Sequence, residues 1–169
     1  KKALSLVGEY IAIGGMPKAV STWIETKDYL RVHDLHHEII IAYTQDFQKY
    51  AQKYQIKYVD LLFERAPLQI GKKFKYGNVS DTYRKRELEP CLSLLEKADV
   101  INKVTCTKAQ AIPLGSDANP DFFKVIILDV ALTQTLLGLD LNEWIFDPLN
   151  AFNNKGEIVE AFVGQELLA

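Results

Sequence analysis

The chain has 169 residues, of which 48% are apolar and 25% carry charge, and its formal net charge is −2. A chain of this size and composition can bury a sizeable core, and it fits one domain or two small units that share an interface. The weak negative charge gives no sign of a nucleic-acid or membrane partner, so any attraction by cations must be local.

The chain contains two cysteines, Cys91 and Cys106, whose spacing matches neither a metal-binding pair nor a disulfide framework. No apolar run is long enough to span a bilayer, and no signal segment begins the chain. We therefore predict a cytoplasmic protein with free, buried thiols and without a membrane partner. Because Lys1 is not a methionine and the last residues continue a helical pattern, we also expect a piece of a longer protein.

Helical periodicity predicts two short helices at the start of the chain. In the first, Val7 and Ile11 lie on one side, and the pair Gly14-Gly15 ends the helix. Pro17 can be the first residue of the second helix, because its fixed backbone angle suits that position.

The longest predicted helix runs from Asp28 to about Tyr54, where Gly and Pro are absent and apolar residues recur every three to five positions. Another helix follows over 58–63 and ends before the next proline. The next helix is expected to begin at Ser80, which is a suitable N-cap residue. Pro90 lies inside this helix, so we expect a kink or a break there.

Two β-type runs follow, over 100–107 and 122–128, and a long polar loop separates them. Helix, turn, helix and two strands is the order of elements in a winged helix. We therefore predict an α+β fold, mostly α, made of a helical bundle and a winged-helix unit, which is a helix-turn-helix followed by a β-hairpin. The expected divisions are a helical segment at 1–56, the winged-helix unit at 57–130 and a helical C-terminal segment at 131–169. We expect the last segment to be the truncated start of a further core.

The stretch "KKFKYGNVSDTYRKR", residues 72–86, concentrates six cations and three aromatic residues in a chain of slightly negative charge. Its cations are Lys72, Lys73, Lys75, Arg84, Lys85 and Arg86. In the predicted fold they lie in the turn and the first turns of the recognition helix. Cations there can neutralise phosphates, and the helix can reach base edges in the major groove of DNA.

The same cluster also fits a solvated surface that binds no nucleic acid. The consecutive cations of 84–86 spread over about 200° on a helix, so they cannot all face one groove. Glu87 and Glu89 dilute the positive field. The aromatic residues alternate with polar ones, as the core anchors of a turn do; they are Phe74, Tyr76 and Tyr83.

Other chemistry-bearing residues give weaker patterns. His33 and His37 are four residues apart and could face one metal ion, but no distant His or Cys completes a site, so we expect a solvated or interfacial helix face. Glu157 and Glu160 near the C-terminus could bind a divalent ion, although a nuclease site would also need acids and a lysine on strands. Because no GxxxxGK[ST] phosphate loop occurs, the chain is not itself a nucleotide-hydrolysing unit.

Six blocks of the sequence, in order, resemble one family. They are "YIAIGGMPKAV" (10–20), "YTQDFQKYA" (43–51), "KKFKYGNV" (72–79), "LEPCLSLLEKADVINKV" (88–104), "PLGSDANPDFFKVIILDVAL" (113–132) and "NKGEIVEAFVGQELLA" (154–169). Together they resemble the C-terminal domain of unknown function that follows the ATPase core in a large group of prokaryotic AAA-type ATPases. The resemblance covers nearly the whole chain.

The resemblance implies an α-rich region with a winged helix, preceded in the full protein by a P-loop ATPase domain that would bind ATP and Mg²⁺. That ATPase domain would be one partner of this chain, which needs no cofactor of its own. The resemblance also implies a restriction-endonuclease-like core that begins near the final helix, where Glu160 would match an acidic residue that binds metal.

The sequence therefore leaves three functions to compare. The first is a non-catalytic accessory module that connects an AAA-type ATPase to a partner. The second is a DNA-binding winged-helix module that contacts phosphates through the cations of 72–86. The third is the N-terminal part of a metal-dependent nuclease, with Glu160 as one ligand.

Overall fold

The computed structural model of the chain describes residues 2–110 and 112–169. Its α-helices are α1 (Lys2–Ile13), α2 (Pro17–Thr26), α3 (Tyr29–Tyr50), α4 (Ile56–Arg65), α5 (Lys85–Lys97), α6 (Val130–Leu136), α7 (Asn142–Phe146), α8 (Pro148–Asn154) and α9 (Gly156–Leu168). Short 3₁₀ helices are η1 (Ala66–Gln69), η2 (Tyr76–Asn78) and η3 (Leu114–Asp117), and the strands are β1 (Ile101–Cys106) and β2 (Asn119–Ile127). The expected α+β class with mostly α structure is confirmed. None of the described helices is long and apolar enough to cross a membrane.

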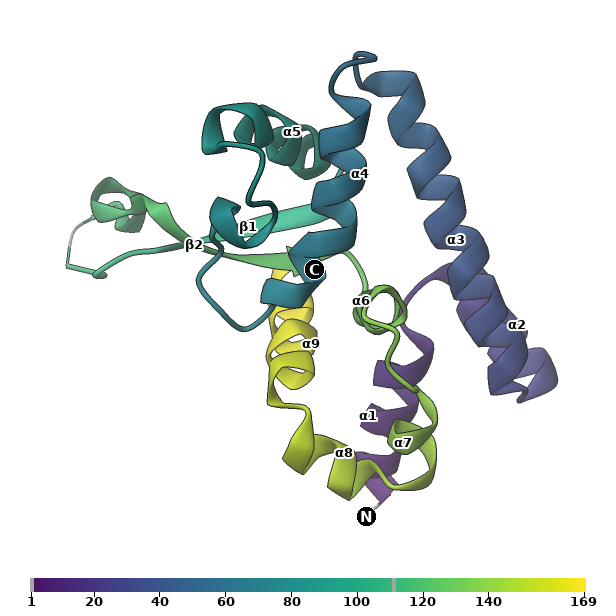
Figure 1. Cartoon of the computed structure of the whole chain (residues 1–169). Helices are drawn as coiled ribbons and strands as arrows, with labels where there is room; N and C mark the ends of the chain where they lie inside the picture. Colours follow the sequence, from purple (N-terminus) through teal and green to yellow (C-terminus); the bar gives the residue numbers. More distant parts are fainter. Residues whose placement is uncertain (1, 111) are drawn as a thin grey trace.

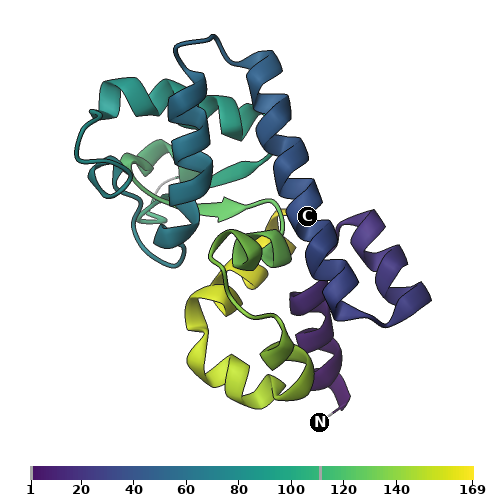
Figure 2. The same ribbon diagram turned by 45° about the vertical axis from the view of Figure 1, so that its right-hand side comes forward.

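The two strands lie between helices. Helices α4 and α5 cover one side of the hairpin, and α9 packs on the other side (Figure 1). Helices α1, α7 and α8 form a second group, together with α6. Figure 2 shows that α3 runs along both groups and that α2 folds back beside its first half.

Helix α3 begins where the sequence predicts but is shorter than expected. The Asp28 carboxylate caps its start by accepting hydrogen bonds from the N–H groups of Leu30 and Arg31, at 3.0 and 3.4 Å. The helix ends at Tyr50 because a turn follows: the Gln55 N–H donates to the Gln52 carbonyl oxygen at 2.7 Å. The prediction that the helix continues to about Tyr54 is therefore wrong by one turn.

Helix α5 starts later than the sequence suggests. The Ser80 hydroxyl oxygen accepts hydrogen bonds from the N–H groups of Thr82 and Tyr83, at 3.0 and 3.2 Å, so it closes a local turn. The N-cap is Arg84, whose backbone N–H donates to the Glu87 carboxylate at 3.0 Å. This bond, from the N-cap backbone N–H to an acid at the third helical position, is one of the two hydrogen bonds of a capping box.

Pro90 lies within α5, yet the helix continues without a break from Lys85 to Lys97. The side chain is exposed. Water can therefore solvate the carbonyl group that the missing N–H leaves without a helical partner. The apolar residues on the opposite side hold the helix against the core, so the expected break does not occur.

The hairpin pairs β1 with β2 in antiparallel register, from Ile101 opposite Ile127 to Thr105 opposite Phe123, and the register shifts after Thr105. The two strands lie at the predicted places, and β2 begins three residues before the expected start. The backbone N–H of Phe74 also donates to the Phe123 carbonyl oxygen at 2.9 Å. This bond attaches the segment before η2 to the outer edge of β2.

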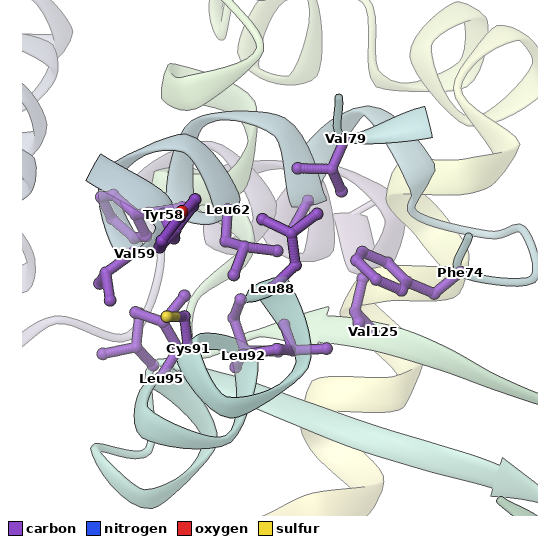
Figure 3. Close-up of a cluster of buried hydrophobic side chains, with 14 of the residues drawn as sticks. Tyr58, Val59, Leu62, Phe74, Val79, Leu88, Cys91, Leu92, Leu95 and Val125 are labelled. Atoms are coloured by element: carbon purple, nitrogen blue, oxygen red, sulfur yellow. The ribbon is translucent and has the colours of Figure 1, made fainter. Parts of the chain in front are cut away.

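The first hydrophobic core fills the space between α4, α5 and the hairpin. Figure 3 shows Leu62, Leu88 and Leu92 meeting from α4 and α5, with Phe74 and Val125 at one side. Leu62, Leu88 and Leu92 are fully buried. The periodic apolar residues that predicted these two helices are thus the residues that join them.

The second core joins the two ends of the chain. It gathers α1, the first half of α3 and the helices from α6 to α9, with the fully buried Trp144 among them. The Trp144 indole N–H donates to the Gln134 side-chain oxygen, and the Gln134 amide donates to the Ile11 carbonyl oxygen at 3.0 Å. A buried amide with both ends bonded fixes how α1, α6 and α7 meet.

Candidate nucleic-acid interface

The structure places the six predicted cations in two segments that lead into α5. Lys72, Lys73 and Lys75 lie in the irregular segment between η1 and η2, while Arg84 caps α5 and the next two residues, Lys85 and Arg86, begin it. All six side chains are exposed. Two of them, Lys73 and Lys85, lie beside the start of β2, so the fold brings part of the cluster together there.

Lys85 is bound to acids of its own chain. Its Nζ lies 2.7 Å from Asp121 Oδ1 on β2 and 3.6 Å from Glu89 Oε1 one helical turn away. The hydrogen bond that Lys85 donates to Asp121 raises the pKa of Lys85, and the same bond lowers the pKa of the Asp121 carboxyl. Lys85 therefore already has the anionic partners that a phosphate would replace.

Two other lysines of the cluster also have partners. Lys72 Nζ lies 3.7 Å from Glu157 Oε1 on α9. Lys73 Nζ lies 4.5 Å from the centre of the Phe122 ring, which is within the range of a cation–π contact. These contacts direct Lys72 and Lys73 to different parts of the surface.

The remaining three cations, Lys75, Arg84 and Arg86, have no carboxylate within ion-pair distance among the described residues. They are free to meet an anion from outside. Lys75 lies before η2, and the two arginines lie at the start of α5.

The aromatic residues of the stretch are core anchors, as one of the two sequence interpretations expected. The Phe74 ring is 3% exposed and stacks on Phe123 with ring centres 5.4 Å apart. Tyr83 meets Tyr58 edge to face at 4.8 Å. These rings pack against other rings of the protein, so they are not placed to stack on bases.

Acids share the exposed side of α5 with the cations. Glu89 faces Lys85, and Glu96 lies 2.9 Å from Lys103 Nζ on β1. The connection between the strands, residues 107–118, contains a single Lys or Arg in its sequence, which is Lys108. The surface formed by α5 and the hairpin is therefore mixed in charge.

Sequence reasoning missed Asp121 and Phe122 as partners of the cluster. They are 36 and 49 residues away in sequence from Lys85 and Lys73 and meet them only in the folded hairpin. An acid at the start of a predicted strand, after a long polar loop, gives no local signal of its partner. Only the antiparallel pairing and the packing of α5 on the hairpin bring these residues together.

Among the described residues, the candidate metal ligands do not assemble into a complete metal site. Glu160 Oε1 lies 2.5 Å from Lys124 Nζ on β2, so this carboxylate is held by a lysine of its own chain. His33 and His37 meet edge to face with ring centres 4.6 Å apart. Among the described residues there is no group of three or more His, Cys, Asp or Glu side chains that could hold a metal ion.

A buried carboxylate that the sequence did not single out joins two distant blocks. Asp129 accepts hydrogen bonds from the N–H groups of Ala131 and Leu132 at the start of α6 and from the Gly15 N–H at 2.7 Å. Gly14 has φ +76°, and a Cβ added to it would lie 2.5 Å from Asp129 Oδ1. The glycine pair and Asp129 therefore form one contact between α1, α2 and α6.

His36 lies beside this contact. Its ring is fully buried, and its Nε2 lies 2.9 Å from the carbonyl oxygen of Ile13, which is the last residue of α1. Burial lowers the pKa of His36, while the bond to Ile13 and the charge of Asp129 oppose this shift. The neutral ring therefore serves as a structural donor, and of the three histidines it is the one that the fold withdraws from solvent.

Comparisons with known proteins give one family. A family model described as "Domain of unknown function (DUF8612)" matches residues 4–143, which extend from α1 into α7. No curated protein and no solved structure matches the chain.

Proposed function

The chain belongs to the DUF8612 family, whose function is unknown, so its function has to be inferred from its own sequence and surfaces. We propose that it is a non-catalytic interaction module of an AAA-type ATPase. In this proposal the module binds protein and not DNA. The parent protein's P-loop domain would bind ATP and Mg²⁺ and would be one partner of this chain. The six ordered blocks that resemble the C-terminal region of such ATPases support this assignment.

The observation that carries the proposal is that two of the six cations are already paired with acids of the same chain. Lys85 is paired with Asp121 and Glu89, and Lys72 with Glu157. A surface that binds DNA releases counterions from phosphates through free lysines and arginines. Lys85 and Lys72 gain much less from phosphate because they already have acidic partners, and the mixed charge around them suits a protein partner.

A winged-helix unit is part of the proposal. The order α4, η2, α5, β1, β2 supports it, since η2 occupies the place of a shortened middle helix. The hydrogen bond from Phe74 to Phe123 also supports it, because it adds a short third segment to the hairpin. The connection between α4 and α5, residues 66–84, is longer than the three- or four-residue turn of a helix-turn-helix.

The test is a titration of a fluorescent DNA duplex with this chain from about 50 to 200 mM salt. A protein that makes 6–10 phosphate contacts loses roughly 10³–10⁵-fold in affinity over this range. We expect weak binding with a much smaller salt dependence. Tight binding whose salt dependence falls in the double variant Arg84→Glu/Arg86→Glu would overturn the proposal.

A second variant tests whether the ion pairs of Lys85 are the reason for the expected weak DNA binding. Asp121→Asn combined with Glu89→Gln releases Lys85, so we expect DNA affinity and salt dependence to rise. The matched control removes two exposed acids that form no ion pair with the described residues, in Glu25→Gln/Asp34→Asn. If both double variants raise the affinity equally, net charge and not the pairing of Lys85 determines DNA binding.

DNA binding is the second candidate, and the unpaired arginines favour it. Arg84 and Arg86 lie at the start of α5, where a recognition helix of a winged-helix protein contacts DNA. The salt titration decides between the two candidates, because only phosphate contacts give a steep salt dependence.

A further inference from the structure

An apolar groove opens at the edge of the first core, where the last turns of α3 and α5 approach α4. Its volume is about 350 Å³, and its floor is formed by Phe47, Val59 and Leu95. Figure 3 shows Val59 and Leu95 close together at one end of the buried cluster. The groove therefore gives a bound side chain direct access to residues of the core.

A large aromatic side chain stands exposed at this edge. Tyr50, which lines the groove, is 84% exposed. Tyrosine is enriched among the residues that dominate binding at protein interfaces, because its ring is large and its hydroxyl stays hydrated. An exposed tyrosine that lines an apolar groove is thus typical of a docking surface.

The charge of the rim indicates which kind of partner fits. Among the described residues, Lys97 is the one charged residue that lines the groove, and its side chain is exposed. Unlike Lys72 and Lys85, Lys97 has no carboxylate within ion-pair distance in the described part of the chain. Lys97 therefore attracts an acidic group to this rim.

We infer that this groove binds a protein segment that presents a bulky apolar side chain flanked by acidic residues, such as one face of an amphipathic helix. The inference rests on the proposed function, because it names the docking site of the proposed interaction module. The apolar side chain would cover Val59 and Leu95, and a carboxylate would meet Lys97.

The probe for the test is a labelled amphipathic peptide of about 15 residues with Leu and Phe on one face and Glu on both flanks. A second peptide carries Lys in place of each Glu. In ¹⁵N-resolved NMR of the whole chain, the acidic peptide should shift the amide signals of residues 47–51 and 94–98, and the basic peptide should not. Lys97→Glu should weaken the acidic peptide about fivefold, the effect expected of an exposed ion pair.

Two variants serve as controls. Lys108→Glu makes the same charge change in the connection between the strands and should leave the peptide affinity unchanged. Ala98→Trp places a large ring at an exposed position that lines the groove, and it should block binding. Equal binding of both peptides, or no shifts at 47–51 and 94–98, would overturn the inference.

Sedimentation of the free chain tests whether a second copy of the chain, and not an acidic segment of another protein, occupies the groove. A dimer that Ala98→Trp abolishes would assign the groove to a second copy and contradict the acidic segment. Failure of the peptide test leaves the proposed function standing when DNA binding is weak. Steep salt-dependent DNA binding contradicts the proposed function whatever the peptides do.

Discussion

At the scale of single residues, Asp129 joins the start of α6 to the turn between α1 and α2. Its carboxylate satisfies two N–H groups at the start of α6 and the Gly15 N–H, and the side chain is 2% exposed. Gly14 is needed opposite it, because its positive φ and the close approach of Asp129 leave no room for a side chain. The first and fifth blocks of the family resemblance meet at this contact.

Asp129→Ala is predicted to lower the free energy of unfolding by about 3 kcal/mol. Loss of an N-cap costs about 1 kcal/mol, and buried N–H groups left without acceptors cost about 1–3 kcal/mol more. Urea unfolding measures the change. The matched control is Asp28→Ala, which removes the N-cap of α3 at a half-exposed position and should cost only about 1 kcal/mol. Equal costs for the two variants would show that the bond to Gly15 contributes nothing.

At the scale of elements, α5 and the hairpin position the candidate surface. The buried stripe of α5 fixes which side of the helix faces solvent, and that side carries Lys85 and Glu89 next to Asp121 of β2. On the other side of the hairpin, α9 brings Glu160 to Lys124 and Glu157 to Lys72. The acids of α9 that could have bound a metal ion instead bind lysines.

Pro90→Ala is predicted to stabilise the chain by about 1–2 kcal/mol. Proline in an exposed helix interior is about 3 kcal/mol less favourable than alanine, and the greater flexibility of the unfolded chain offsets part of this gain. The measurement is the urea midpoint with an unchanged m-value. A destabilised variant would show that the proline ring makes contacts that its exposure does not suggest.

At the scale of the whole molecule, two hydrophobic cores share α3. The core of α4, α5 and the hairpin meets the last turns of this helix, and the core of both chain ends meets its first half. Strand β2 also leads directly into α6 through Leu128 and Asp129. Residues of the predicted segments 1–56 and 131–169 lie in one core.

We predict a single cooperative unfolding transition. Trp23 and Trp144 both belong to the second core, so tryptophan fluorescence reports on that core. Leu92→Ala creates a cavity in the first core and should destabilise it by about 2–5 kcal/mol. The fluorescence transition should then shift together with the circular dichroism transition. A fluorescence midpoint that stays unchanged would show that the two cores unfold independently.

Much of the fold could be predicted from the sequence, because local signals determined it. Apolar periodicity located the helices α1 to α4, β-type runs located the two strands, and Pro17 and Asp28 marked the starts of α2 and α3 correctly. The start of α5 was missed because Ser80 forms a local turn, and the capping acid Glu87 lies later. Such local alternatives have similar energies, so packing of the helix decides between them.

The sequence by itself determined the α-rich class, the hairpin and the residues of the cationic stretch. Only the tertiary structure decided how those cations are used. Lys85 meets Asp121 and Lys72 meets Glu157 across large separations in sequence, and no local pattern encodes such pairs. Coulomb interactions act through space between groups that folding brings within a few ångströms, so the state of a charged surface is fixed by packing and not by composition.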